Sequence, residues 1–183
     1  MSRSVRASPF RRNVHGVEYI REPEGRITAR TVAEMHRLVR AAKIDHRVQD
    51  LASRMARRCP RKDYWCEAKA VFDFAKAYVR YIRDPDDVEL IQSVWRTLGR
   101  RAGDCDDGAI LVSGLLASIG FPYRFITLKA SPERPHEWSH VYAEAYIPGR
   151  GWTAADWSVT HAGLGWEPGR YYERRAWPAP KEP

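Results

Sequence analysis

The segment GDCDDGAILVSGLLASIGFPYRFI, residues 103–126, has the clearest structural pattern in this chain. Its apolar residues recur at helical spacing, and Gly120 ends the run. We therefore expect a short, mostly buried helix that begins at or beside Cys105.

The pattern changes after this helix. Three short segments, residues 123–130, 140–147 and 152–159, are aromatic and β-branched with partial alternation, which predicts strands. A turn of sequence PGRG at residues 148–151 separates the last two, so they should form an antiparallel hairpin.

Helices are expected upstream. Apolar residues recur at three- and four-residue steps over residues 28–58, with a break into two helices near residues 44–45. Asp63 is a plausible N-cap for a further helix, which should end before Asp84, and a polar loop should follow up to Gly99. Helices followed by strands predict an α+β domain.

The chain has 183 residues, of which 44% are hydrophobic and 30% charged, as expected for one domain with accessory segments. We divide it into a basic arm without periodicity (1–27), an N-terminal helical segment (28–62), a core (63–160) and a tail rich in Gly, Trp and Pro (161–183). No run approaches the roughly 18 apolar residues of a membrane span.

The excess positive charge lies in the first third. Residues 1–60 hold 14 Lys and Arg against 6 Asp and Glu, whereas the remainder is balanced at 17 against 17. Such a segment can bind nucleic acid, phosphate or an acidic protein surface, or it can be a solvated Arg-rich helical face with a disordered tail. No apolar segment follows the basic N-terminus, so we expect no secretory signal and a cytoplasmic protein.

The three cysteines are Cys59, Cys66 and Cys105. An odd count without a visible signal peptide predicts reduced thiols. The spacing of Cys59 and Cys66 fits none of the usual zinc patterns, so both are expected to be structural.

Cys105 has the position of a nucleophile. The N–H groups and the dipole at a helix N-terminus stabilise a thiolate, and such a nucleophile needs a base that is itself oriented by a partner. His140 opens one strand of the predicted hairpin and Asp156 lies on the other, roughly opposite. Cross-strand neighbours are close enough for a hydrogen bond between a carboxylate and an imidazole.

The quoted stretch, followed by WSHVYAEAYIPGRGWTAADWS at residues 138–158, resembles the core of the transglutaminase-like cysteine-protease superfamily. The resemblance extends over about residues 82–159 and implies a papain-like fold. It also implies a catalytic triad of Cys105 as nucleophile, His140 as general base and acid, and Asp156 as orienter of the imidazole. Residues 81–107 look like the forms of this domain in tailed bacteriophages and prophages.

In this family the carbonyl is polarised by the backbone N–H of the cysteine and by a donor from upstream, often an indole or an amide. Trp95 and Gln92 are the candidates here. Asp104, Asp106 and Asp107 flank the cysteine; they either complement the helix dipole or offer oxygen ligands to Ca²⁺, which some relatives bind near this motif. No cofactor is otherwise expected.

The resemblance implies acyl transfer from an amide through a thioester on Cys105, with hydrolysis of a peptide or isopeptide bond as the preferred outcome. Trp138, Trp152 and Trp157 are expected in the core or in the walls of a cleft, which suits an extended protein or peptide substrate. The alternatives are a protein-crosslinking transglutaminase and a non-catalytic virion or assembly protein with the same fold, virion-associated if phage-encoded. A nucleic-acid partner for the basic third is a weaker alternative, and no membrane partner is expected.

Overall fold

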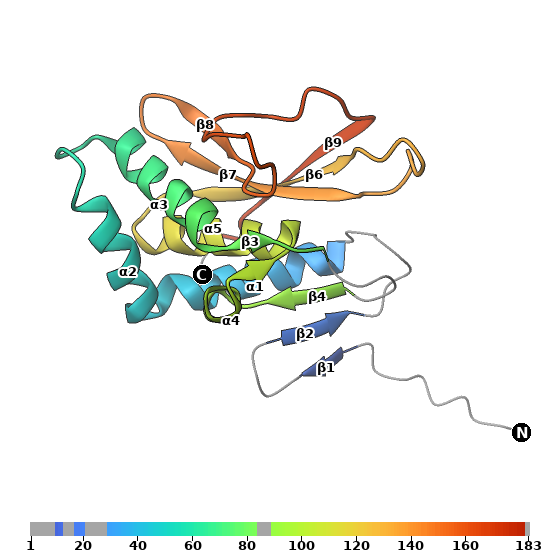
Figure 1. The fold of residues 1–183 in the computed structure, drawn as a ribbon, viewed down its shortest axis with the longest axis horizontal. Coiled ribbons are helices and arrows are strands. Elements are labelled where there is room, and N and C mark those ends of the chain that lie inside the picture. Colours follow the sequence, from blue (N-terminus) through green and yellow to red (C-terminus); the bar gives the residue numbers. More distant parts are fainter. Residues whose placement is uncertain (1–9, 13–16, 21–28, 84–88, 182–183) are drawn as a thin grey trace, which may run out of the picture.

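The computed structural model describes residues 10–12, 17–20, 29–83 and 89–181 (Figure 1). A four-stranded antiparallel sheet has the order β8-β7-β6-β9. Its strands are β6 (Tyr123–Lys129), β7 (His140–Ile147), β8 (Gly151–Ala155) and β9 (Glu173–Pro178). The helices lie on one side of this sheet, so the domain is α+β, as predicted.

Helix α5 (Cys105–Ser118) lies at the centre of the domain, between the sheet and α1. Nearly every residue after Cys105 is buried, because the helix packs against β7 on one side and against the other helices on the rest of its surface. Asp104 caps its N-terminus, and Gly120, at a φ of 97°, ends it. The predicted helix and its Gly120 end are confirmed.

Two glycines let α5 approach its neighbours closely. A Cβ atom on Gly108 would lie 2.1 Å from Cε3 of Trp157, and one on Gly114 would lie 2.7 Å from Cγ2 of Val94. These positions therefore require glycine, and they fix how the sheet and the neighbouring helix lie against α5.

The upstream helices are α1 (Ala29–Ile44), α2 (His46–Ala56) and α3 (Tyr64–Tyr78). Asp45 separates the first two and caps α2, where its side chain accepts a hydrogen bond from the backbone N–H of Arg47. Asp63 caps α3 through the N–H of Cys66. The predicted break and the predicted N-cap are both confirmed.

The segment expected to be a polar loop before Gly99 contains β4 (Glu89–Gln92) and most of α4 (Val94–Arg100). Ser93 is the N-cap of α4, and Arg101 is its C-cap. Two short strands, β3 (Arg80–Tyr81) and β5 (Ala102–Gly103), pair in parallel just before α5. The loop prediction was wrong because these elements are held by pairing and capping rather than by an apolar period.

Part of the basic arm is ordered as well. Strands β1 (Phe10–Arg12) and β2 (Val17–Ile20) pair with β4 in a three-stranded antiparallel sheet. The rest of the predicted arm lies outside the described residues. The tail also contributes structure, because β9 pairs with β6 and completes the main sheet.

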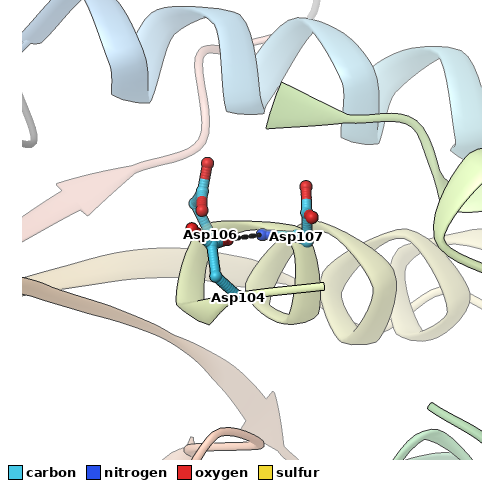
Figure 2. Close-up of side chains that lie close together, drawn as sticks. All are labelled: Asp104, Asp106 and Asp107. Atoms are coloured by element: carbon cyan, nitrogen blue, oxygen red, sulfur yellow. Dashed lines mark hydrogen bonds between the residues drawn. The ribbon is translucent and has the colours of Figure 1, made fainter. Parts of the chain in front are cut away.

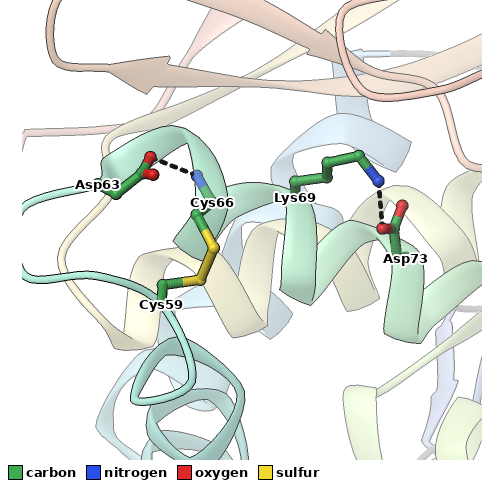
Figure 3. Close-up of a disulfide and its surroundings, with 5 residues drawn as sticks. All are labelled: Cys59, Asp63, Cys66, Lys69 and Asp73. Carbon is green, nitrogen blue, oxygen red and sulfur yellow. Dashed lines mark hydrogen bonds and ion pairs between the residues drawn. A yellow bond between two sulfur atoms is a disulfide. The ribbon is translucent and has the colours of Figure 1, made fainter.

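Cys59 and Cys66 form a disulfide with their Cα atoms 5.7 Å apart (Figure 3). The prediction of reduced thiols was wrong for this pair. The short connection from α2 to α3 folds back on itself and brings the two cysteines together. The disulfide therefore fixes where α3 starts relative to the end of α2.

No helix in the described part of the chain is long and apolar enough to cross a membrane.

Candidate active site

Cys105 is the first residue of α5 and the only cysteine outside the disulfide. It is half-buried and packs against the main hydrophobic core. Strand β5, held by β3, leads the chain into this position. The N–H groups of the first helical turn have no earlier carbonyl within the helix to bind, so this end of α5 favours a thiolate at Cys105.

The imidazole of His140 and the carboxylate of Asp156 are joined, with Nε2 of His140 2.8 Å from Oδ2 of Asp156. His140 is the first residue of β7, and Asp156 directly follows β8. The pair Ala143–Ala155 fixes the register, so Asp156 lies one step beyond the last pair and diagonally across from His140. A diagonal neighbour on an antiparallel pair is within reach of a histidine side chain.

Asp156 is buried and well supplied with hydrogen bonds. Its Oδ1 accepts from the backbone N–H of Ser158 at 3.2 Å and from the hydroxyl of Ser158 at 2.7 Å. Burial alone would raise the pKa of Asp156, but the hydrogen bonds from His140 and Ser158 outweigh it and hold the pKa below its usual value. The carboxylate is therefore ionised at neutral pH and favours the tautomer in which Nε2 of His140 bears the hydrogen.

The two proposed donors for an oxyanion are engaged elsewhere. The side-chain amide of Gln92 donates to the carboxylate of Asp107 and, at 3.3 Å, to the carbonyl of Ala102. The indole N–H of Trp95 donates to Oδ2 of Asp45 at 2.9 Å. The side-chain N–H groups of both residues therefore already have acceptors, so the sequence-based choice of donor is not supported.

Asp104, Asp106 and Asp107 lie together at the first turn of α5, with one oxygen of each within 4.8 Å of the others (Figure 2). Asp104 caps the helix by accepting from the N–H of Asp107. Both oxygens of Asp107 accept from Gln92, one from its backbone N–H at 2.7 Å and one from its side chain. Ca²⁺ takes six to eight oxygen ligands, and the carboxylates of Asp104 and Asp107 already accept hydrogen bonds inside the protein, so Ca²⁺ binding at this cluster stays a prediction.

The family model of the transglutaminase-like superfamily matches residues 49–157, more than half of the chain. The chain belongs to this superfamily. No curated protein sequence matches it.

Three solved structures are similar to this transglutaminase-like domain. A candidate cysteine protease from Cytophaga hutchinsonii is 21% identical with a TM-score of 0.52, over 87% of this chain and 54% of that one. A candidate protease from Parabacteroides distasonis is 12% identical (TM-score 0.48; 82% and 30% covered), and a TGase is 13% identical (TM-score 0.44; 80% and 37% covered). The chain spans about half the length of the first and less of the others, and at these identities the likeness concerns the fold.

Three residues near the transglutaminase-like site were not predicted as functional. Lys76 of α3 donates to the carbonyl of Val159, and the charge of Asp156 acts on its ammonium group. Tyr81 of β3 lies opposite Gly103 and close to Cys105. Trp157 follows Asp156 and covers Gly108. Of these residues, Trp157 was expected in the core or in a cleft wall. Tyr81 could not be found from the sequence, because a strand of two residues has no periodic pattern.

Proposed function

We propose that this chain is a cysteine-dependent acyl-transfer enzyme that hydrolyses peptide or isopeptide bonds. The observation on which the proposal rests is the 2.8 Å contact between His140 and Asp156 beside a helix that begins with Cys105. Helix α5 packs against β7, the strand that starts at His140, so the nucleophile and the base belong to directly packed elements.

The chemistry follows from the tautomer of His140. With its Nε2–H group donated to Asp156, Nδ1 is left to accept the proton of the Cys105 thiol. The thiolate attacks the carbonyl carbon of the amide, and the imidazolium then gives the proton to the leaving amine. Water attacks the resulting thioester, with His140 again as base, and releases the acid.

Hydrolysis is preferred over crosslinking because the Cytophaga hutchinsonii structure, which has a TM-score of 0.52, is a candidate cysteine protease. A protein-crosslinking transglutaminase would use the same thioester with an amine as acceptor, and an assembly protein would form no thioester. The similarity to bacteriophage forms and a virion location remain predictions.

The first test is alkylation of Cys105 by iodoacetamide as a function of pH, read from the mass of the intact, non-reduced protein. The disulfide protects Cys59 and Cys66, so each added group reports on Cys105. We expect thiolate reactivity at about pH 6 in the wild type and its loss in His140→Ala. His46→Ala, which changes an exposed histidine on α2, is the matched control.

The second test separates the acceptors. Casein is incubated with the protein in the presence and absence of a dansylated primary amine, and fragments and fluorescent protein are measured. New fragments support hydrolysis, whereas dansyl incorporation supports transamidation. If Cys105 alkylates only as an ordinary thiol and casein is unchanged, the enzyme proposal fails and an assembly role is favoured.

A further inference from the structure

Tyr81 is held beside the start of α5 by backbone pairing. Strand β3 pairs in parallel with β5, with Tyr81 opposite Gly103, two residues before Cys105. The N–H of the next residue, Ile82, donates to the carbonyl of Gly103 at 2.8 Å. The position of Tyr81 relative to the cysteine is therefore fixed by the fold.

The side chain of Tyr81 is held by packing while its hydroxyl stays available. The ring lies against Trp157, with the ring centroids 6.1 Å apart, and Trp157 in turn covers Gly108 of α5. The residue is 49% exposed, and within the described part of the chain its hydroxyl forms no hydrogen bond. A phenol placed in this way has its donor capacity unused next to the nucleophile.

The charges around Tyr81 keep it protonated. Partial burial and the negative charges of Cys105 and Asp104 raise the pKa of Tyr81 to about 12. At neutral pH the hydroxyl therefore remains a hydrogen-bond donor, even when Cys105 is a thiolate.

We propose that the hydroxyl of Tyr81 donates a hydrogen bond to the carbonyl oxygen of the substrate that acylates Cys105. It would be the second donor to this oxygen, beside the backbone N–H of Cys105. This inference rests on the proposed function. When the sulfur bonds to the carbonyl carbon, the electron pair of the C=O double bond moves to oxygen, and the O–H group of Tyr81 donates a hydrogen bond to that oxyanion without giving up its proton. Collapse of the intermediate restores the C=O bond and expels the leaving group, which leaves a thioester.

Tyr81 takes the place that the sequence suggested for Trp95 or Gln92. The indole N–H of Trp95 already donates to Asp45. The side-chain amide of Gln92 already donates to Asp107 and to the carbonyl of Ala102. Tyr81 is instead half-exposed and next to the cysteine. A preorganised donor aimed at the developing charge stabilises the transition state more than the bound substrate.

The test compares two reagents on one sulfur. Acylation of Cys105 by p-nitrophenyl acetate passes through an oxyanion and releases p-nitrophenolate, whereas alkylation by iodoacetamide displaces iodide at a saturated carbon and forms none. We expect Tyr81→Phe to slow acylation by roughly 10- to 100-fold while alkylation at the same pH changes by less than about twofold. Tyr78→Phe, at the end of α3, is the matched control and should leave both rates unchanged.

The outcomes separate the two proposals. If the wild type is acylated faster than a Cys105→Ala background and Tyr81→Phe is equally fast, the role of Tyr81 is overturned and the enzyme proposal stands. If acylation and alkylation fall together in Tyr81→Phe, the residue acts on the thiolate or on packing, and its role as donor is again overturned. If the wild type shows no acylation above background, the proposed function fails and the role of Tyr81 fails with it.

Discussion

Histidine occupies two contrasting environments in this chain. His140 lies at the start of a strand with a buried carboxylate as its partner. His36, in α1, is buried among the rings of Tyr123 and Phe125, and its Nδ1 lies 3.1 Å from the hydroxyl of Tyr123. The first environment places the imidazole against a carboxylate, whereas the second is apolar and disfavours a proton on the imidazole.

The environment of His36 makes stability depend on pH. Burial and the nearby charge of Arg40 lower the pKa of His36 from 6.5 to about 4. The unfolded chain therefore binds a proton on this residue before the folded chain does, and stability should fall by about 1–3 kcal/mol as pH drops from about 6.5 to about 4. Denaturant unfolding at both pH values should show a smaller fall in His36→Gln; an equal fall in both proteins would mean that His36 titrates normally in the folded state.

The sequence predicted the contact between His140 and Asp156 better than it predicted what the side chains of Trp95 and Gln92 bind. Counting outward from the turn at residues 148–151 put His140 near Asp156, because hairpin register is set by the turn and the alternation of the strands. The donors of Trp95 and Gln92 could not be assigned in this way. Their partners, Asp45 and Asp107, lie 50 and 15 residues away in sequence, and only the packed structure brings them together.

The contact between α5 and the segment after β8 depends on the absence of a side chain at Gly108. A Cβ on Gly108 would collide with the ring of Trp157, which also packs on Tyr81. We expect Gly108→Ala to destabilise the protein by about 1–3 kcal/mol and to slow alkylation of Cys105 at low pH, since Trp157 adjoins Asp156.

A helical glycine with open space provides the control for that substitution. Gly99 of α4 has nothing within 4 Å of the position that a Cβ atom would take, so Gly99→Ala should be neutral or should stabilise by up to about 1 kcal/mol through helix propensity. Urea unfolding of the two variants measures the contrast. Equal stability of both variants would show that Trp157 can move aside at little cost.

Elements with a strong internal period were predicted closely, and the others were not. Helix α5 and strand β7 have clear patterns and were placed at their observed starts. Strands β3 and β5 have two residues each, too few for a period, and β9 is set by its pairing with β6, which lies far away in sequence. Local patterns contain no information on such pairings.

For the whole molecule, the C-terminal segment closes one edge of the main sheet. Strand β9 covers β6, whose residues 125–128 are buried, and the indole N–H of Trp177 donates to Oγ1 of Thr127 at 2.9 Å. Without β9, the backbone N–H and C=O groups along one side of β6 would lose their partners.

A chain ending at Arg170 should therefore be less stable than the full chain and should associate as its concentration rises, because β6 would become an unprotected edge. Thermal unfolding and light scattering after size-exclusion chromatography measure the two effects. A chain ending at Pro180 keeps β9 and should match the full chain in both. If the chain ending at Arg170 also matches the full chain, β9 is dispensable for folding.

The protein contains a disulfide, Cys59–Cys66, that is intact only when oxidised, and a thiol, Cys105, that is a nucleophile only when reduced. A strong reductant that protects the Cys105 thiol from oxidation would also open the bond between α2 and α3, whereas an oxidising solution that preserves the bond would favour sulfenic acid or mixed disulfides at Cys105. The potential of the surrounding thiol pool therefore sets a window, positive enough to keep one couple oxidised and negative enough to keep the other reduced. A glutathione mixture poised inside that window is the medium in which scaffold and nucleophile are both intact.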